Sequence, residues 1–512
     1  MTSSLTTGRL AAAATRTEAA LAVHAPGLVA GFLDALPAAA DTVGRRLRGA
    51  LAREGLTDGD PRHGTRHAFN RWEYPSAGAD DPVDLLTGID APAFAAELRN
   101  AVINLAIATA RHHTGTSDNP DENAVWLERR AVSGHNLHPC GRTRLGWDTA
   151  DVLQHDLENG HTRLHFIAVR DAAHLGDDLA DFLDLPPAPP GYRTQPLHAW
   201  QRDLVVDRYP QLFTDGTLRL LDGAIDTVPT AALRTLLLPP AADGRRHYLK
   251  VSLDIQVTST RRSISVASTR NGPALATLLH DLVADEPTVL LMTETAGAAV
   301  PAGPGRDMSA ILREGLTGRL QPGETAIPGS GLPYLIPDLV TAHGGGPAAW
   351  LRDYTRLLLP PLLRLAARGV GFEAHLQNCL PTFVNGHPHR LALRDFAGLR
   401  LHAPRLAAAG HTVDLWPGSV VGTTEVAVMR AKLGYTAFQA HLGEIILGLP
   451  LNEDEAWRIV RDVVDEVYDQ LDAPDDHAAF TAPRVPHKAL VRMRLAGDGD
   501  LYIPVRNPLH GI

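Results

Sequence analysis

YLKVSLDIQVT, residues 248–258, carries the clearest strand signal in this chain of 512 residues. Apolar and polar residues alternate along it: Leu249, Val251, Leu253, Ile255 and Val257 against Lys250, Ser252, Asp254 and Gln256. Strict alternation is typical of a strand with one face packed on a core and the other face polar. The segment therefore predicts a sheet in the middle of the chain, with a lysine on its polar face.

The sequence on either side of this strand divides the chain into regions of different texture. From about residue 131 to 275, alternating runs such as RLHFIAVRD (163–171) are separated by Pro/Gly breaks, which predicts several strands. Residues 1 to about 110 predict helices, most clearly at 19–36 and 94–113. The part beyond residue 400 is predicted to be mainly helical, notably at 420–449 and 453–471. A chain this long exceeds one usual core, so two or three lobes are expected.

The composition argues against several functional classes. A net charge of −10 leaves no basic stripe for nucleic-acid phosphates, although local arginine clusters can still bind a small anion. Cys140 and Cys379 are the two cysteines, which argues against a disulfide framework and a cysteine-based zinc site. No apolar run reaches about 18 residues, and the N-terminus lacks the apolar core of a signal peptide. We therefore expect no membrane span and a cytoplasmic location.

A row of polar residues follows in FEAHLQN (372–378), where Glu373, His375 and Gln377 are spaced two apart. The pattern predicts a strand over 370–378, joined by the turn-rich FVNGHPH (383–389) to a second strand over 390–395. Side chains on one strand face are about 6.6 to 6.8 Å apart, a spacing that suits contacts along a polyanion. An all-oxygen set suited to Mg²⁺ is formed by Glu373, Asn378 and Asp395. The alternative is that Glu373 and His375 pair with Arg390 or Arg394 on a solvated sheet face.

The turn after the strand 248–258 offers a candidate phosphate site. TSTRR (258–262) brings two hydroxyls and two guanidiniums to a strand end: Ser259, Thr260, Arg261 and Arg262. Together with Lys250 and free backbone N–H groups, these could cradle a phosphate. The alternative is a hairpin turn with solvated arginines. Neither a GxxxxGK[ST] loop nor a GxGxxG loop after a strand is present, so a bound nucleotide would not be held by either glycine-rich device.

A third cluster lies in SGHNLHPCGRTRLG (133–146), with His135, His138, Arg142 and Arg144. Zinc binding by the histidines lacks a Glu or Cys to complete a standard ligand set. A carboxylate-binding pocket fits better, because guanidiniums offer forked donors and imidazoles add further ones. A loop with satisfied histidines is the alternative.

Taken in their order along the chain, these clusters resemble the motifs of the NRPS-independent siderophore synthetases, the IucA/IucC or aerobactin synthetase family. GHNLHPCGRTRLG resembles the family's GHPxHPxxKxRxG, PLHAWQ (196–201) its PxHPWQ, and KVSLDIQVTSTRR with NGP (271–273) its KxSLxxxxTSxxR…GP segment. AILRE (310–314), EAHLQN and RDFAG follow, and the chain closes with KALVRMRL and YIPVRNPL, as family members do. The resemblance covers about residues 130 to 510.

The resemblance implies an ATP-dependent condensation. A carboxylate, such as citrate or a dicarboxylate derivative, becomes an acyl-adenylate with release of pyrophosphate, and an amine, hydroxylamine or alcohol then attacks. It also implies an α+β fold shaped like a cupped hand. A helical thumb would span residues 1–130, β-rich fingers 131–290 and a mixed, kinase-like palm 291–512, with ATP between fingers and palm. Family members are usually homodimers.

The resemblance also assigns residues to roles. Phosphate contacts fall to Lys250, Ser259, Thr260 and Arg262. Mg²⁺ would be held by Glu373, Asn378 and Asp395, and the nucleotide would also be contacted by His375 and Gln377. The residues expected to take part in catalysis are Lys250, Arg262 and His375. The carboxylate pocket would be lined by His135, His138, Arg142, Arg144 and Arg313.

The sequence departs from the family pattern at two positions of the first motif. Arg142 replaces a lysine, so that a flat fork stands where a point charge is usual, and Asn136 replaces a proline. Both departures bear on the choice of carboxylate and leave the nucleotide residues unchanged. Two other functions stay open at this point: a kinase-like phosphotransferase, which would release ADP, and a siderophore- or carboxylate-binding protein without turnover.

Overall fold

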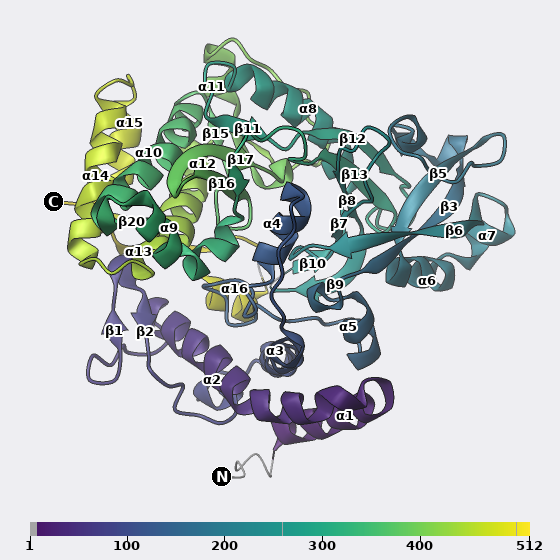
Figure 1. Cartoon of the computed structure of the whole chain (residues 1–512), viewed down its shortest axis with the longest axis horizontal. Helices are drawn as coiled ribbons and strands as arrows, with labels where there is room; N and C mark the ends of the chain where they lie inside the picture. The colour runs from purple at the N-terminus through teal and green to yellow at the C-terminus, as the bar shows by residue number, and fades with distance from the viewer. Residues whose placement is uncertain (1–7, 259, 498, 512) are drawn as a thin grey trace.

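The computed structural model describes residues 8–258, 260–497 and 499–511 and combines helices with several sheets (Figure 1). The predicted α+β class is confirmed. In Figure 1 the N-terminal helices form the lower part, an eight-stranded sheet stands at the right, and the C-terminal helices gather at the upper left. Of the helices in these ranges, none combines the length and the apolar character needed to span a bilayer. Cys140 and Cys379 are both free and buried.

The N-terminal region is helical as predicted over most of 94–113, but it divides the predicted stretch 19–36 between two helices and has no α-helix over 54–91. Its helices are α1 (Arg9–His24), α2 (Val29–Arg53), α3 (Pro92–Arg111) and α4 (Pro120–Glu128). The stretch 19–36 is not one helix, because the chain leaves helical geometry at Ala25 and Pro26 starts a short 3-10 turn. Residues 54–91 form loops and 3-10 turns around the short pair β1 (Thr65–Arg66) and β2 (Trp72–Glu73). Their many Gly, Pro and Asp residues favour turns over helix.

An eight-stranded antiparallel sheet, the fingers sheet, confirms the predicted β-rich middle of the chain. Its strand order is β4-β12-β13-β8-β7-β6-β3-β5. The strands are β3 (Thr162–Arg170), β4 (Leu175–Gly176), β5 (Tyr192–His198), β6 (Leu218–Pro229), β7 (Thr235–Leu237), β8 (His247–Val251), β12 (Glu294–Ala299) and β13 (Ser309–Glu314). The helices of this part are α5 (Thr149–His155), α6 (Ala199–Arg208), α7 (Pro210–Thr214) and α8 (Val266–Leu282). The sheet continues past residue 290 through β12 and β13, and the predicted boundaries at 130 and 290 stay predictions.

The segment 248–258 is two strands rather than one. The ladder breaks at Ser252, so that β8 belongs to the fingers sheet while β9 (Leu253–Val257) forms a hairpin with β10 (Thr260–Arg262). The predicted polar face exists but does not face solvent, because Lys250, Ser252 and Asp254 are all buried. Asp395 of the C-terminal region contacts Lys250, whereas Ser252 donates to the Arg306 carbonyl and Asp254 pairs with Arg208 of α6.

The C-terminal region, the palm, packs its helices and a four-stranded sheet around one core. The sheet order is β11-β17-β16-β14, with β11 (Val289–Leu291), β14 (Thr325–Ala326), β16 (Cys379–Val384) and β17 (His387–Leu393). The helices are α9 (Ile336–His343), α10 (Gly346–Ala367), α11 (Ala403–Ala408), α12 (Val426–Leu433), α13 (Gly443–Leu447), α14 (Glu453–Tyr468), α15 (Pro474–Phe480) and α16 (Leu490–Ala496). A π-helix, η9 (Gly434–Leu442), joins α12 to α13. The helices predicted within 420–449 and 453–471 are thereby confirmed.

Two smaller sheets complete the palm. One contains β15 (Val370–Gly371), β18 (Arg400–His402) and β19 (Gly422–Thr423), and the other is the hairpin of β20 (Arg484–Lys488) and β21 (Tyr502–Arg506).

The strand predicted over 370–378 is wrong, although the alternation within it is real. β15 ends at Gly371 and strand pairing resumes only at Cys379, so FEAHLQN is an extended segment followed by a turn. Its apolar residues are buried in the palm core, whereas its polar residues Glu373, His375 and Gln377 are partly exposed. Burial of alternate residues therefore orients the polar side chains without a neighbouring strand.

The second predicted strand, 390–395, is confirmed in part as β17, which starts and ends earlier. β16 and β17 are joined by Asn385 and Gly386, both at positive φ (50° and 79°), the conformation that two-residue hairpin turns require. β17 ends at Leu393, and the backbone of Asp395 then turns with a φ of 65°. Asp395 is thus held in a tight turn just after the end of β17, an inner strand of the palm sheet.

Candidate functional site

Lys250 and Asp395, which lie 145 residues apart, join the fingers sheet to the palm. Lys250 Nζ is 2.5 Å from Asp395 Oδ1. Burial opposes ionisation of Asp395, but the ammonium of Lys250 and the guanidinium of Arg234 outweigh it and hold the pKa of this carboxyl below its usual range. The structure therefore brings the predicted phosphate-binding lysine and a predicted metal ligand into one charged pair.

Two residues that sequence reasoning missed, Arg234 and Glu294, surround this pair. Arg234 donates to the carbonyl oxygens of Arg262 and Ser263 at 3.1 and 3.0 Å, and burial lowers its pKa. Glu294, the first residue of β12, is 1% exposed; burial raises its pKa and Lys250 opposes that shift. Neither residue belongs to a quoted motif, and each is placed here only by the pairing of the fingers strands.

The predicted metal ligands Glu373, Asn378 and Asp395 lie in one neighbourhood. The Arg394 backbone N–H donates to the Asn378 carbonyl at 3.1 Å, and Asn378 Nδ2 donates to the Glu373 carbonyl at 3.0 Å. Lys432 Nζ lies 2.9 Å from Glu373 Oε1. Within the described ranges, no residue donates a hydrogen bond to Glu373 Oε2, Asn378 Oδ1 or Asp395 Oδ2. Oxygens of this kind are the ligands that Mg²⁺ prefers, so the three residues fit the ion.

The alternative partners considered for Glu373 and His375 are engaged elsewhere. Arg390 pairs with Glu324, and Arg394 pairs with Glu128. The Arg394–Glu128 pair is buried and links the palm to α4. The interpretation of FEAHLQN as a solvated face with arginine partners is therefore wrong.

A cavity lies between the first histidine motif, the β9–β10 hairpin and FEAHLQN. Six of the predicted site residues line it: His135, Arg142, Arg144, Arg262, His375 and Gln377. The lining does not include His138, Lys250, Arg313, Glu373, Asn378 and Asp395. Ser259 lies outside the described residues, and so does the side chain of Thr260. Three clusters that are distant in sequence therefore meet around one cavity, with the Lys250–Asp395 pair close to Arg262.

Arg262 is the predicted phosphate ligand that this cavity presents most directly. Its Nη2 reaches the Thr258 hydroxyl at 3.4 Å, and it has no carboxylate partner among the residues that the structure describes. Burial lowers its pKa to about 10, and the neighbouring Arg234 adds to the effect. Because that value is still well above neutral, the guanidinium stays charged. A partly buried cation without a counter-ion is suited to binding an anion.

Arg142 and Arg144, by contrast, are neutralised within the protein. Arg144 donates two hydrogen bonds to Asp156, at 3.0 and 3.1 Å, and Arg142 pairs with Glu158 and lies 3.8 Å from Asp156. All four side chains are almost completely buried. This network fixes one wall of the cavity, and it leaves less of the two guanidiniums for a substrate carboxylate than their position in the motif suggested.

His138 and Arg313, also predicted for the carboxylate pocket, are buried outside the cavity lining. Arg313 lies in β13 with its guanidinium 4.9 Å from the ring centroid of Tyr248, and its pKa is lowered by burial and by Arg394. Asp395 is among its charged neighbours. Arg313 therefore belongs to the surroundings of the Lys250–Asp395 pair.

The histidines of the site are held in one tautomer by the backbone. Nδ1 of His135, His138 and His375 accepts a hydrogen bond from the backbone N–H two residues further on, at 3.1, 2.9 and 3.2 Å. Burial lowers the pKa of His135 to about 3 and also lowers the pKa of His375, so both rings are neutral. A neutral ring with an accepting Nδ1 carries its hydrogen on Nε2. The rings are thus N–H donors, which suits phosphate oxygens and leaves no lone pair for zinc.

Lowering the pH is expected to destabilise the fold through His135. The folded protein keeps the ring neutral down to about pH 3, whereas the unfolded chain takes up a proton near the usual pKa of about 6.5. The stability that the neutral ring permits is therefore present above pH 6.5 and is lost as the pH falls. Between pH 6 and pH 5 the wild type should lose at most about 1.4 kcal/mol more than His135→Gln in urea unfolding. Equal losses in both proteins would contradict the assignment.

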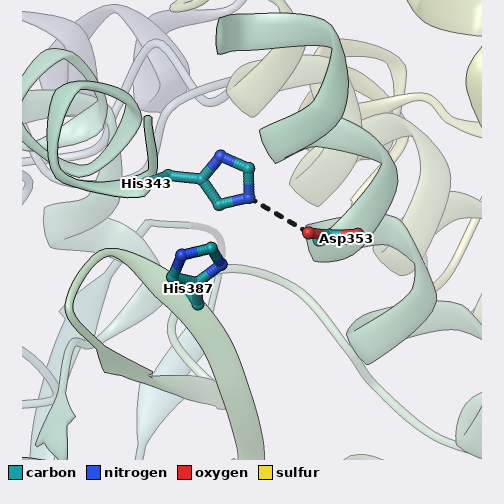
Figure 2. A group of neighbouring side chains, drawn as sticks. All are labelled: His343, Asp353 and His387. Carbon is teal, nitrogen blue, oxygen red and sulfur yellow. Dashed lines mark hydrogen bonds and ion pairs between the residues drawn. The ribbon is translucent and has the colours of Figure 1, made fainter. Parts of the chain in front are cut away.

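A separate group of possible metal ligands lies on the palm surface, formed by His343, Asp353 and His387 (Figure 2). His343 Nε2 is 3.0 Å from Asp353 Oδ2, and the two imidazole rings are 4.3 Å apart. His343 Nδ1 accepts the Gly345 N–H at 3.1 Å, so Nε2 carries the hydrogen that is donated to Asp353. That hydrogen occupies the position a metal would need. The contacts explain the group as a surface His–Asp pair, and we assign no ion to it.

Two protein-family models match the chain. The IucA / IucC family matches residues 123–334, and the ferric iron reductase FhuF-like transporter family matches residues 348–503. The first match contains the histidine motif and the β9–β10 hairpin, and the second contains FEAHLQN and Asp395.

Individual relatives extend over most of the chain. D-ornithine–citrate ligase of Staphylococcus aureus is 23% identical over 471 residues, which cover 77% of this chain and 71% of the ligase. The solved structure of the petrobactin biosynthesis protein AsbB from Bacillus anthracis gives a TM-score of 0.80 at 20% identity, covering 94% of this chain and 98% of AsbB. ATP-bound aerobactin synthetase IucA from Klebsiella pneumoniae gives 0.74 at 19% identity, covering 92% and 100%. These structures share the fold described here.

Proposed function

We propose, since this chain belongs to the IucA/IucC family of NRPS-independent siderophore synthetases, that it is an ATP-dependent ligase which joins a carboxylic acid to an amine, hydroxylamine or alcohol. The observation that carries the proposal is the contact between Lys250 and Asp395. It puts a cation suited to phosphate and a carboxylate suited to Mg²⁺ at one point between the two sheets. The ATP-bound relative of the same fold supports the nucleotide, and the citrate ligase supports the reaction class.

Triphosphate binding falls to the cations on the fingers side. Lys250 supplies a buried ammonium, and Arg262 supplies a guanidinium that has no carboxylate partner among the described residues. Arg234 donates a hydrogen bond to the Arg262 carbonyl. His135 and His375 add neutral N–H donors to the lining of the cavity. Neutral donors hydrogen-bond phosphate oxygens without taking a proton from them, so their contribution does not depend on pH above their lowered pKa values.

Glu373, Asn378 and Asp395 would hold Mg²⁺. When bound there, the ion supplies positive charge that neutralises phosphate oxygens as the carboxylate approaches. Lys432 already compensates part of the negative charge of Glu373, and Lys250 part of that of Asp395. The protein therefore keeps two acidic side chains ionised in a buried site before any ligand arrives.

The reaction that fits these groups has two steps. A carboxylate oxygen attacks the α-phosphorus of ATP, the bond to the β-phosphate oxygen breaks, and pyrophosphate leaves with the electron pair. The nucleophile then attacks the carbonyl carbon of the acyl-adenylate, and AMP leaves as the amide or ester forms, with the proton of the nucleophile passing to solvent. No residue stands out as a dedicated base among those the structure describes at the cavity. Holding the two reactants in contact supplies much of the acceleration in such a site.

The products of turnover test the proposal. We expect AMP and pyrophosphate in equal amounts when citrate, succinate or their mono-amides are combined with polyamines or N-hydroxylated diamines. ADP in place of AMP would identify a phosphotransferase. An absence of nucleotide turnover with every pair would favour a binding protein without catalysis. The homodimer implied by the resemblance and the cytoplasmic location expected from the sequence stay predictions.

A further inference from the structure

A second cavity lies against α2 and β2, next to the first. Its lining includes Arg45, Arg46, Arg53 and Arg71, and we refer to it as the arginine pocket. Both cavities are lined by Arg46, Ser133, Asn136 and Glu444, so they share a wall. Arg46 and Arg53 are two helical turns apart on α2, which places them on the same face of the helix.

The carboxylates in the lining of this pocket, Glu73 and Glu444, are already engaged. Arg71 Nη2 lies 2.6 Å from Glu73 Oε1, and Arg71 Nη1 lies 2.7 Å from Glu444 Oε2. Asn136 Nδ2 also donates to Glu444 Oε2, at 3.0 Å. Arg71 thus uses these two acidic groups, and Arg45 pairs with Asp41 at 2.8 Å, whereas Arg46 and Arg53 have no carboxylate partner among the described residues.

Arg53, the last residue of α2, is the arginine of this pocket for which the described residues provide no partner. It makes no ion pair or hydrogen bond with the residues in the described ranges, and its Nε is buried. The adjacent carboxylate, Glu54, is occupied by the backbone N–H groups of Val491 and Arg492, at 2.9 and 2.7 Å. Burial lowers the pKa of Arg53 to about 10, and Arg71 adds to the effect. The side chain is charged at neutral pH, buried in part and unpaired, which is costly unless an anion binds.

Two neighbours of Arg53 strengthen this conclusion. Tyr435, whose phenol interacts electrostatically with Arg53, has a buried hydroxyl without a hydrogen-bond partner in the described part of the chain. Arg46 is held by the Ser133 carbonyl at 2.7 Å and the Ser133 hydroxyl at 2.6 Å, and it has no ion-pair partner among the described side chains. Cations without a carboxylate partner in the described part of the chain therefore extend from Arg53 to Arg46, which also lines the first cavity.

Asn136, one of the two departures from the family motif, lines the arginine pocket. It stands where the family motif has proline, and its amide donates to Glu444 and to the Ala440 carbonyl at 3.1 Å. Proline has no side-chain donor and could make neither bond. The departure from the motif thus occupies an acceptor of Glu444 in the shared wall.

We propose that the arginine pocket binds a carboxylate carried by the nucleophile, so that the second substrate is an amino acid or another amine bearing a carboxylate. The inference rests on the proposed ligase function. Polyamines are cations, and a pocket whose acidic residues are engaged by Arg71 and Asn136 would repel them. The reacting acid has to lie in the first cavity, next to the cations that bind the triphosphate, whereas the arginine pocket borders that cavity at Arg46. A nucleophile anchored at Arg53 and Arg46 would therefore approach the adenylate from the thumb side.

The test compares amino acids with their decarboxylated partners: ornithine with putrescine, 2,3-diaminopropionate with ethylenediamine, and serine with ethanolamine. The wild type should use at least one amino acid better than its partner. Arg53→Gln removes the charge and leaves a shorter, polar side chain. It should raise the KM for that amino acid roughly 10- to 100-fold, the loss of one charged hydrogen bond. The KM for the decarboxylated partner should not change, and Arg53→Lys should restore part of the affinity.

Pyrophosphate exchange measured with the acid and ATP alone separates this proposal from the proposed function. Exchange by Arg53→Gln should equal that of the wild type, because adenylation precedes the nucleophile. Arg66→Gln, which removes an exposed arginine of the same region, serves as the matched control and should change neither assay. Decreased exchange in Arg53→Gln, or no preference for an amino acid in any pair, would overturn the inference. A wild type without exchange for any acid would instead refute the ligase function.

Discussion

Asp395→Asn is expected to lower carboxylate-dependent pyrophosphate release on the order of 10³-fold, the effect typical of removing one preorganised electrostatic contact in an active site. Asparagine keeps the shape of the side chain and is tolerated at positive φ, so the turn at 65° should persist. The negative charge is lost, and with it both the pairing with Lys250 and an anionic oxygen for Mg²⁺. Alanine would be a poorer choice, because it accepts neither the backbone geometry nor a hydrogen bond from Lys250.

The measurement is initial-rate release of pyrophosphate at saturating ATP, with thermal unfolding to verify the fold. Asp353→Asn is the matched control: it removes an aspartate from the His343 pair on the palm surface, and its rate should equal that of the wild type. An Asp395→Asn rate within about threefold of the wild type would mean that neither the metal role nor the ion pair matters for adenylation. Raising the Mg²⁺ concentration should recover part of the lost rate if the charge acts through the ion.

The sequence predicted the segments that form the site better than it predicted their secondary structure. FEAHLQN was expected to be a strand because its residues alternate, but alternation reports only which side chains are buried. An extended segment fixed by Phe372 and Leu376 in the core satisfies that pattern without a hydrogen-bonded neighbour. The prediction that Glu373, His375 and Gln377 share a polar side of the segment is therefore correct, although the predicted strand is wrong.

The same limit applies to the face that carries Lys250. Alternation identified a polar face but could not tell a solvated face from a buried one. The partner of Lys250 is Asp395, 145 residues away, and no local pattern encodes that pairing. Arg234, Glu294 and Arg53 were missed for the same reason, since a lone arginine or glutamate in sequence gives no sign of what surrounds it after folding.

The arginines of the first motif show how sequence reasoning can miss an ion-pair partner. Arg142 and Arg144 were assigned to a substrate because they offer forked donors. Their partners Asp156 and Glu158 follow within the same stretch of sequence, in DLEN, and this was the signal available. Spacing alone does not say whether two acids will fold back on two bases, whereas the structure shows all four packed together.

Asp156→Ala is expected to destabilise the protein by about 3 to 5 kcal/mol, the usual effect of removing one partner from a buried ion pair. Asp156 accepts two hydrogen bonds from Arg144 and one from the Leu157 N–H, at 2.8 Å. Burial opposes its ionisation, but Arg144 and Arg142 outweigh that effect, and the pKa of Asp156 falls to about 2. Without it, two buried guanidiniums would share Glu158.

Urea unfolding at neutral pH measures this effect, and Asp462→Ala provides the matched control. Asp462 pairs with Arg352 at 3.2 Å on the surface, with both side chains well exposed, so its loss should change the unfolding free energy by less than about 1 kcal/mol. Because the folded pKa of Asp156 is depressed, its contribution is complete above about pH 4 and is lost as the pH falls towards 2. The difference between wild type and Asp156→Ala should therefore shrink over that range. A difference below 1 kcal/mol at pH 7 would mean that Arg142 and Arg144 do not need this partner. It would favour the original prediction that the two arginines bind the substrate carboxylate.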